Sequence, residues 1–406
     1  MSNDSIADSR ERMQEAAWEQ VEGEARLMMQ KLLNELMEAE RAEFLGASPY
    51  ERCGERRGHR NGFSRRAIDS RCGPLKLRIP RVRRAERPLR TRLLAAYQRR
   101  QRQIERCALQ WVAAGMSTRQ VSREMHRAFG AVVSAGTVSR LVAQIDEEMA
   151  RFRQRHHPDG FRHLYLDGKH GRVSRPRRRG RGRGTAKKAV LLLAWGMGRD
   201  GAEELIDFRV APDESERSWD GFLRDLRARG VVEENQRGQR LERIISDGDG
   251  GIEAALALNY PDTPHQLCVF HKIKNLLGDL VDKSLKGRIQ SEAGRIFEAP
   301  TRGEALRRLN RWRLRWRGPE PAAAAHFLRD RDRMLLFYES PPAERRRVKT
   351  TNPVERFIRE LDRKFERMGV FPTVASWERA TYLVYRQLLE RGYRPTRSKT
   401  PFTQTS

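Results

Sequence analysis

Apolar side chains at helical spacing mark the first part of the chain. They recur every three or four positions between residue 14 and about residue 45, at Val21, Ala25, Met28, Leu32, Leu36 and Phe44. This spacing predicts one long amphipathic helix. Its apolar face can pack on the rest of its own chain or contact a second subunit, and we favour the first.

Glycine and proline divide residues 49–92 into short segments. The alternating Leu75, Leu77 and Ile79 predict a small β element that ends at Pro80. The nearby thiol and imidazole groups are a weak zinc signal, because they lack paired chelating spacing and have no fourth ligand close by. We therefore expect free thiols at Cys53 and Cys72.

Residues 103–146 contain three helical patterns, separated by a glycine turn and a polar turn. This order is typical of a helix-turn-helix, whose last helix enters the major groove of DNA. Thr137, Ser139 and Arg140 lie near the start of that last helix, where base edges and phosphates are reached. The alternative is a small helical trio with a purely structural core.

The hydrophobic period changes from residue 162 onward. Short apolar runs predict strands in HLYLD, AVLLLAWG and ELIDFRV, followed by a helix in SERSWDGFLRDLRARG and a fourth strand in RIISD. Three consecutive strands, a helix and a further strand are the beginning of a ribonuclease H-like sheet. Helical patterns fill about 272–340, and NPVERFIRELDRKF then starts a final long helix. We therefore expect an α/β fold with a ribonuclease H-like core that is interrupted by an all-helical insertion.

These patterns divide the chain into six segments. They are an N-terminal amphipathic helix region (1–48), a small basic module (49–100), a helix-turn-helix domain (101–150), the first part of the core (160–271), the helical insertion (272–345), and the final core helix with the C-terminal region (346–395).

The charge of the chain is large and unevenly distributed. Lys and Arg number 82 against 54 Asp and Glu, a net charge of +28, which excludes an acidic or neutral housekeeping enzyme. Residues 1–50 are acidic, whereas 51–110 carry 19 basic and 5 acidic side chains, and 171–188 carry 9 basic and no acidic ones. Such density favours a nucleic acid partner, because each neutralised phosphate releases counterions.

Composition also bounds the class of protein. The hydrophobic fraction of 38% is enough for sizeable cores, so wholesale disorder is excluded. No apolar run approaches the roughly 18 residues of a membrane helix, and the four cysteines are scattered. We expect a cytoplasmic protein without disulfides or membrane association.

Three carboxylates stand where a metal-dependent nuclease would need them. Asp167 ends the first predicted strand, Asp247 ends the fourth, and Glu355 lies in the first turn of the final helix. The first and fourth strands are neighbours in such a sheet, so the three side chains are expected to converge. Mg²⁺ prefers carboxylate oxygens, and two ions about 4 Å apart can activate the attacking oxygen and stabilise the leaving one.

Each acid also has a structural interpretation. Asp167-Gly168 is a hairpin-turn signal, Asp249 competes with Asp247 for the same role, and residues 352–355 form a capping box with Asn352 as the cap.

The chain resembles the Mutator-type transposases of bacterial insertion sequences, which belong to the DDE class. The likeness extends from about residue 45 to 390 and rests on an ordered series of motifs: GHRNGFSRR, LRIPRVR, GMSTRQVS, VSAGTVSR, YLDGKHGRV, SWDGFLRDLRARG, IISDGDGGIEAAL, HQLCVFHKIKN and RVKTTNPVERFIRELDRKFERMGVFPT. The resemblance implies that Asp167, Asp247 and Glu355 are the catalytic, metal-binding triad. It also implies a C-x-x-H signature at Cys268 and His271, which we interpret as structural or near-site residues. The sequence departs from the family pattern at Asp249 and in the arm RPRRRGRGRG.

A transposase of this kind is expected to use two Mg²⁺ (or Mn²⁺) ions to cut a transposon end and to join the exposed 3′-hydroxyl to target DNA. The expected DNA-binding residues are Arg60, Arg81, Arg119, Thr137, Ser139 and Arg140. The expected partner is double-stranded DNA, at the terminal inverted repeats and at the target, in the bacterial cytoplasm and nucleoid. Two ends must be handled together, so a homodimer or higher assembly is expected. The competing classes are a non-enzymatic DNA-binding protein, such as an inactive, domesticated transposase, and a nuclease without strand transfer.

Overall fold

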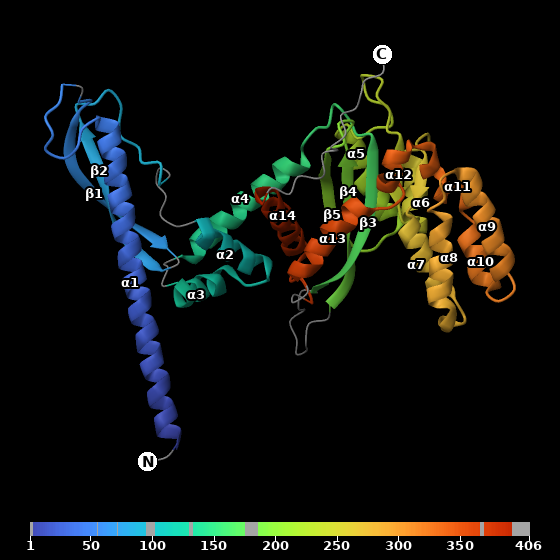
Figure 1. The fold of residues 1–406 in the computed structure, drawn as a ribbon, viewed down its shortest axis with the longest axis horizontal. Coiled ribbons are helices and arrows are strands. Elements are labelled where there is room, and N and C mark those ends of the chain that lie inside the picture. Colours follow the sequence, from blue (N-terminus) through green and yellow to red (C-terminus); the bar gives the residue numbers. More distant parts are fainter. Residues whose placement is uncertain are drawn as a thin grey trace. The chain divides into compact units, whose positions relative to one another are not determined.

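The computed structural model describes residues 3–54, 56–70, 72–94, 102–129, 133–174, 186–365 and 369–391. The chain divides into two compact units, Met1–Ile145 and Asp146–Ser406 (Figure 1). In the described part of the chain, no helix is long and apolar enough to cross a membrane. The six-segment division stays a prediction.

The first unit begins with a long helix packed on a β-hairpin. Helix α1 (Asn3–Leu45) starts earlier than expected. It lies against the antiparallel strands β1 (His59–Ser70) and β2 (Gly73–Arg83). The small core between them consists of Met37, Ile68, Leu75 and Leu77. The amide side chains of Gln30 and Asn34 accept hydrogen bonds from backbone N–H groups of β2, at 2.9 Å each, so α1 also covers the edge of this strand.

Strand β2 does not end at Pro80 as the sequence had indicated. It continues to Arg83, and Pro80 lies opposite Phe63, where the pairing register shifts. Proline is tolerated at such an irregularity because no ladder hydrogen bond from its nitrogen is required there.

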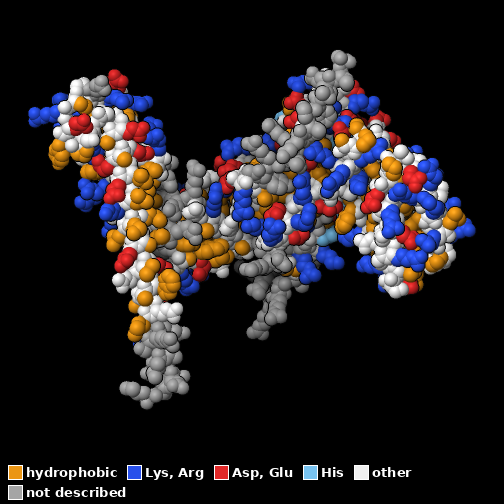
Figure 2. All heavy atoms as spheres, in the orientation of Figure 1, with side chains coloured by type: hydrophobic (Ala, Val, Ile, Leu, Met, Phe, Trp, Pro, Cys, Tyr) orange, Lys and Arg blue, Asp and Glu red, His pale blue; other side chains and the backbone are white. Residues whose placement is uncertain are grey.

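Much of the apolar stripe on α1 stays exposed within its unit. Figure 2 shows hydrophobic side chains along this helix. The exposed ones at helical spacing are Trp18, Val21, Met28, Leu32 and Leu36. Among the described side chains of α1, those that pack on the hairpin core are Met29, Leu33 and Met37 of its C-terminal half, in partial agreement with the favoured interpretation.

The three predicted helices are confirmed as α2 (Arg102–Ala113), α3 (Thr118–Phe129) and α4 (Ala135–Arg153). Their shared core contains Ile104, Ala108, Val121, Met125, Val133 and Val138. Ser117 caps α3, because its backbone N–H donates to Gln120 Oε1 while its Oγ accepts from the Gln120 N–H.

The second unit is built on a mixed sheet with the strand order β5-β4-β3-β6-β7. Strands β3 (His163–Ser174), β4 (Ala186–Met197) and β5 (Glu203–Ala211) are antiparallel. Strands β6 (Arg243–Ser246) and β7 (His265–Leu267) run parallel to β3. The expected adjacency of the first and fourth strands of this unit is therefore confirmed.

Helices cover both faces of this sheet. Trp219 and Phe222 of α5 (Glu216–Ala228) and Ile252 of α6 (Gly250–Asn259) share one core with apolar side chains of β3, β4 and β5. On the other face, Trp195 of β4 contacts rings of α13 (Asn352–Phe365) and α14 (Val374–Glu390). The expected single final helix is thus two helices, and Thr373 caps the second with a capping box.

A helical block lies between β7 and α13 in the sequence. It contains α7 (Val269–Asp279), η1 (Lys283–Leu285), α8 (Lys286–Ile296), α9 (Arg302–Trp316), α10 (Pro321–Leu328), α11 (Arg331–Met334), η2 (Leu336–Glu339) and α12 (Pro342–Val348). The block has a core of its own, in which the rings of Trp312 and Phe327 contact each other at a tilt, with centroids 5.0 Å apart. The all-helical character predicted for this stretch is confirmed.

Candidate active site

Asp167 lies inside a strand and not at its end. Strand β3 pairs with β4 from His163 to Ser174, and Asp167 is opposite Leu193. This pairing overturns both the predicted strand end and the hairpin-turn interpretation of Asp167-Gly168. The apolar stretch of β4 is long enough to pair with β3 well beyond Asp167, so the polar residues that follow remain in the ladder.

Asp247 follows β6 at the level of Asp167. Tyr165 pairs with Ile245 across the parallel strands, and each aspartate lies two residues further along its strand. A turn then redirects the chain at Gly248, whose φ of +76° suits glycine.

The rival carboxylate Asp249 has a structural contact of its own. It is the N-cap of α6, and its Oδ1 accepts a hydrogen bond of 3.0 Å from the Gly251 N–H. Asp247 Oδ1 accepts from the Asp249 N–H at 3.2 Å, which steadies the turn between them.

Glu355 projects from the first turn of α13, as the sequence predicted. The cap of this helix is Thr351 and not Asn352, because the Thr351 carbonyl accepts the Glu355 N–H at 3.0 Å. The Thr351 hydroxyl, which is fully buried, also donates to Glu355 Oε1 at 3.0 Å. The expectation that Asn352 is the cap is therefore wrong, because the cap is the preceding residue. The carboxylate of Glu355 is held by the hydroxyl of this cap, Thr351.

The electrostatics of Asp167 connect the three acids. Its side chain is 5% exposed, and burial raises the pKa of this carboxyl well above its usual range. The neighbouring carboxylates of Asp247 and Glu355 raise it further, while the Gly168 N–H, which donates to Asp167 Oδ1 at 2.8 Å, opposes the shift. Three acids from three distant segments thus lie close enough to repel one another, and a bound cation would relieve this repulsion.

Cys268 and His271 lie beside Glu355. One potential ligand atom from each of the three residues lies within 4.8 Å of the others. Burial raises the pKa of the Cys268 thiol to about 11. Burial lowers the pKa of His271, an effect that the carboxylates of Asp247 and Glu355 oppose. Both residues therefore adjoin Glu355, and their assignment as structural or near-site residues stays a prediction.

A fourth carboxylate at this site was missed in the sequence. Glu214 precedes α5, and burial together with Asp247 and Asp249 raises its pKa. Its Oε2 is 3.3 Å from Nε2 of His170, and a side chain at position 168 would collide with its carboxylate. Glu214 belongs to no recognisable motif, so only the fold could reveal its position.

Two cations that flank the triad in sequence form ion pairs with other carboxylates. Lys169 pairs with Asp362, and Arg356 Nη2 lies 2.7 Å from Glu203 Oε2. These two pairs connect α13 to β3 and to β5.

The predicted DNA-binding residues have different surroundings. In the helical trio, Arg119, Ser139 and Arg140 are exposed. Thr137 is buried, and its Oγ1 lies 3.0 Å from the Ser134 hydroxyl at the start of α4.

The two predicted contacts on the hairpin also differ. Arg81 is exposed, whereas Arg60 is 17% exposed. Arg60 donates to Glu38 Oε2 and to the Ala47 carbonyl, both at 3.1 Å. The arginine-rich arm falls largely within 175–185, outside the described residues.

Comparisons with known proteins agree along most of the chain. The family model described as "Transposase, Mutator family" matches residues 1–392. A transposase for insertion sequence element IS406 from Burkholderia multivorans is 31% identical over 344 residues, which are 84% of each chain. A transposase for IS905 from Lactococcus lactis is 28% identical over 360 residues, 88% of this chain and 87% of the relative.

Among solved structures, a Drosophila P element transposase strand transfer complex aligns at 11% identity with a TM-score of 0.28. The alignment covers 75% of this chain and 83% of that one, but the score is too low to establish a common fold. Because the family model spans residues 1–392 and the relatives align over more than four fifths of each chain, this chain belongs to the Mutator family of transposases.

Proposed function

We propose that this protein is a DDE-class transposase that binds the terminal inverted repeats of its own insertion sequence, cuts the element ends and joins them to target DNA. The observation that carries the proposal is the convergence of Asp167, Asp247 and Glu355: burial raises the pKa of Asp167, and the nearby carboxylates of the other two acids raise it further. Membership of the family supports the activity. No energy cofactor is required, because one phosphodiester replaces another.

The core is proposed to be ribonuclease H-like. Three antiparallel strands followed by two strands parallel to the first support this assignment. The helical block between β7 and α13 is then the insertion that precedes the glutamate.

The three acids fit Mg²⁺ or Mn²⁺, two ions being proposed. Their donors are hard carboxylate oxygens, and the repulsion that adds to burial in raising the pKa of Asp167 is what a site for a cation is expected to show. When bound, such ions supply positive charge that activates the attacking oxygen and stabilises the leaving oxygen.

The residues of this chain would set the geometry of the reaction. The parallel register of β3 and β6 holds Asp167 and Asp247 level. The Thr351 hydroxyl orients Glu355. The exposed Arg119, Ser139 and Arg140 would contact DNA through α3 and α4, with the basic hairpin beside them in sequence. Two ends must be cut together, so a homodimer or higher assembly is proposed.

The test uses purified protein, duplex DNA carrying the element end, and Mg²⁺. Asp167→Asn, Asp247→Asn and Glu355→Gln should each abolish cutting and joining while leaving DNA binding intact. Asp249→Asn is the matched control, since asparagine caps a helix as well as aspartate does, and it should retain activity. Full activity in any of the three triad variants would show that the triad is misassigned.

The same assay separates the competing classes. A parent protein that protects the inverted repeats in a footprint but never cuts them would be a non-enzymatic binder. Cleavage without joining, with protection that ignores sequence, would indicate a nuclease of the same fold.

A further inference from the structure

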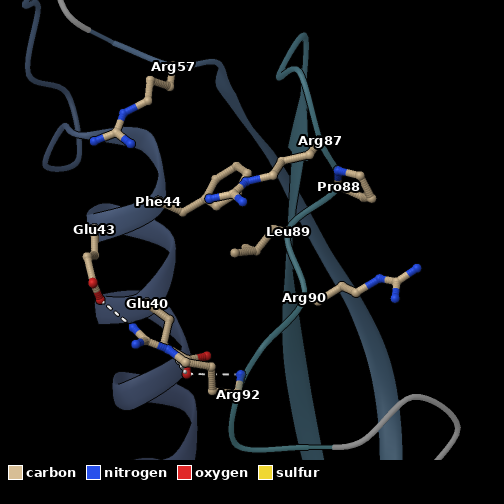
Figure 3. A pocket seen from close by; sticks show the side chains of 9 residues that line it. All are labelled: Glu40, Glu43, Phe44, Arg57, Arg87, Pro88, Leu89, Arg90 and Arg92. Atoms are coloured by element: carbon tan, nitrogen blue, oxygen red, sulfur yellow. Dashed lines mark hydrogen bonds and ion pairs between the residues drawn. The ribbon is translucent and has the colours of Figure 1, made fainter.

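A basic pocket lies in the first unit, away in sequence from the acids. It has a volume of about 680 Å³ and is bordered by the C-terminal end of α1, by Arg57, and by the segment that follows β2 (Figure 3). Its lining residues are Glu40, Glu43, Phe44, Arg57, Arg87, Pro88, Leu89, Arg90 and Arg92. An adjoining pocket of about 560 Å³ shares Phe44, Arg57 and Arg87 with it.

The two carboxylates of this pocket, Glu40 and Glu43, both contact Arg92. Arg92 Nη2 is 2.6 Å from Glu43 Oε2, and the Arg92 backbone N–H donates to Glu40 Oε1 at 3.1 Å. The Thr91 hydroxyl also donates to Glu40. These contacts fasten the segment to α1 and neutralise Arg92, whose own contacts with the two glutamates are the dashed lines in Figure 3.

The other three arginines keep their charge available. Arg57, Arg87 and Arg90 are exposed, and none of them has a carboxylate partner within the described residues. The guanidinium of Arg87 lies over the Phe44 ring, 5.7 Å from its centroid. This contact limits the motion of the side chain without neutralising it. Pro88 fixes the backbone beside it, so ordering this arginine on binding costs little entropy.

We propose that Arg57, Arg87 and Arg90 bind phosphodiester groups along one backbone of duplex DNA. The inference rests on the proposed function and identifies where the basic module would contact the duplex. Guanidinium groups match phosphate oxygens as planar forks. The apolar wall of Phe44 and Leu89 offers a surface for the sugar between phosphates. Arg60, by contrast, donates hydrogen bonds to Glu38 and to the Ala47 carbonyl, and so connects β1 to α1 and to the residues that follow it.

The experiment measures binding of the full chain to an inverted-repeat duplex by fluorescence anisotropy at several salt concentrations. The triple variant Arg57→Gln/Arg87→Gln/Arg90→Gln should bind more weakly. The slope of log Kobs against log salt should become shallower by about 0.9 for each lost phosphate contact, roughly 2.7 in all. The same loss is expected on a duplex of unrelated sequence, since phosphate contacts do not read bases.

The matched control removes three exposed arginines of the second unit that are already paired, through Arg224→Gln/Arg237→Gln/Arg307→Gln. The slope of log Kobs against log salt for this control should change by less than the roughly 0.9 expected for one phosphate contact. A triple Arg→Lys variant of the pocket should keep most of the slope, which separates lost charge from lost folding, and circular dichroism checks the fold of each protein.

One outcome overturns the inference alone: an unchanged slope in the pocket variant while the parent binds the repeat. If that variant has also lost binding of a polyglutamate peptide that the parent binds, the pocket would instead be assigned to an acidic protein segment. A parent that binds no duplex at any salt concentration would overturn the proposed function as well.

Discussion

His163 makes the stability of the second unit depend on pH. It begins β3, its side chain is 1% exposed, and neither ring nitrogen has a hydrogen-bond partner among the described residues. Burial, together with the charges of Arg162, Arg243 and Arg199, lowers its pKa from 6.5 to about 3. The imidazole is therefore neutral in the folded protein and gains a proton on unfolding in mild acid.

The size of the effect follows from proton linkage. The unfolded chain binds more protons than the folded one between the two pKa values, so stability is fully present above pH 6.5 and falls as the pH decreases toward the folded pKa. At pH 5 the protonated form of His163 outnumbers the neutral form by about 30 to 1 in the unfolded chain, while His163 of the folded protein stays neutral. The ratio corresponds to about 2 kcal/mol lost between pH 8 and pH 5. A folded pKa anywhere below about 4 gives nearly the same figure.

The assay is urea unfolding at pH 8 and pH 5, followed by the fluorescence of the buried Trp195, Trp219 and Trp377. In His163→Leu the stability difference between the two pH values should shrink by about 2 kcal/mol relative to the parent. Other buried histidines titrate in parent and variant alike, so they cancel in this comparison. His163→Gln is the control for lost titration without gained apolar packing, and it should shrink the difference equally. An unchanged pH difference in both variants would refute the reasoning.

Two further predictions concern contacts around and beneath the site. Thr351→Val removes the hydroxyl that holds Glu355, so the Mg²⁺ concentration for half-maximal cleavage should rise roughly tenfold. Thr351→Ser keeps a hydroxyl and should return this concentration to the value of the parent. Identical magnesium titrations of cleavage in the parent and both variants would contradict the role of the Thr351 hydroxyl. Arg229→Met removes the nearer of two arginine partners of the buried Asp207 carboxylate, whose Oδ2 lies 2.6 Å from Arg229 Nη2 and whose Oδ1 lies 3.6 Å from Arg153 Nε, and should lower the free energy of unfolding by about 3 kcal/mol. Adding Asp207→Leu should recover much of this loss in urea unfolding, whereas a double variant no better than the single one would show that the pair does not act through charge.

Much of the fold could be predicted because hydrophobic spacing is strong where elements are long. The helical trio, the strands from HLYLD to RIISD and the start of α13 all follow from it. The three-residue strand β7 did not, because so short a run has no period. The extent of β3 beyond Asp167 was also missed, since Asp-Gly suggests a turn unless a long partner strand is available.

The candidate site was predicted less evenly. Asp167, Asp247 and Glu355 stand in recognisable motifs, and the structure places their charges together. Glu214 reaches the same place from a loop without any motif. Arg60 illustrates the opposite difficulty, because a basic residue in a basic segment gives no sign that Glu38 of a distant helix is its partner.

Because α13 follows the helical block in the sequence, Glu355 is translated late and is lost from any product that is truncated before it. The ribosome completes β3 and β6 long before it reaches Glu355, because the whole helical block is translated in between. A frameshift or premature stop within that block would release a fragment that contains the complete first unit but lacks the last acid. Under the proposed function, such a fragment would bind element ends through the first unit without being able to cut them, and it would compete there with intact copies. A mutated copy of the element that still expresses this fragment would thus inhibit transposition of the intact copies.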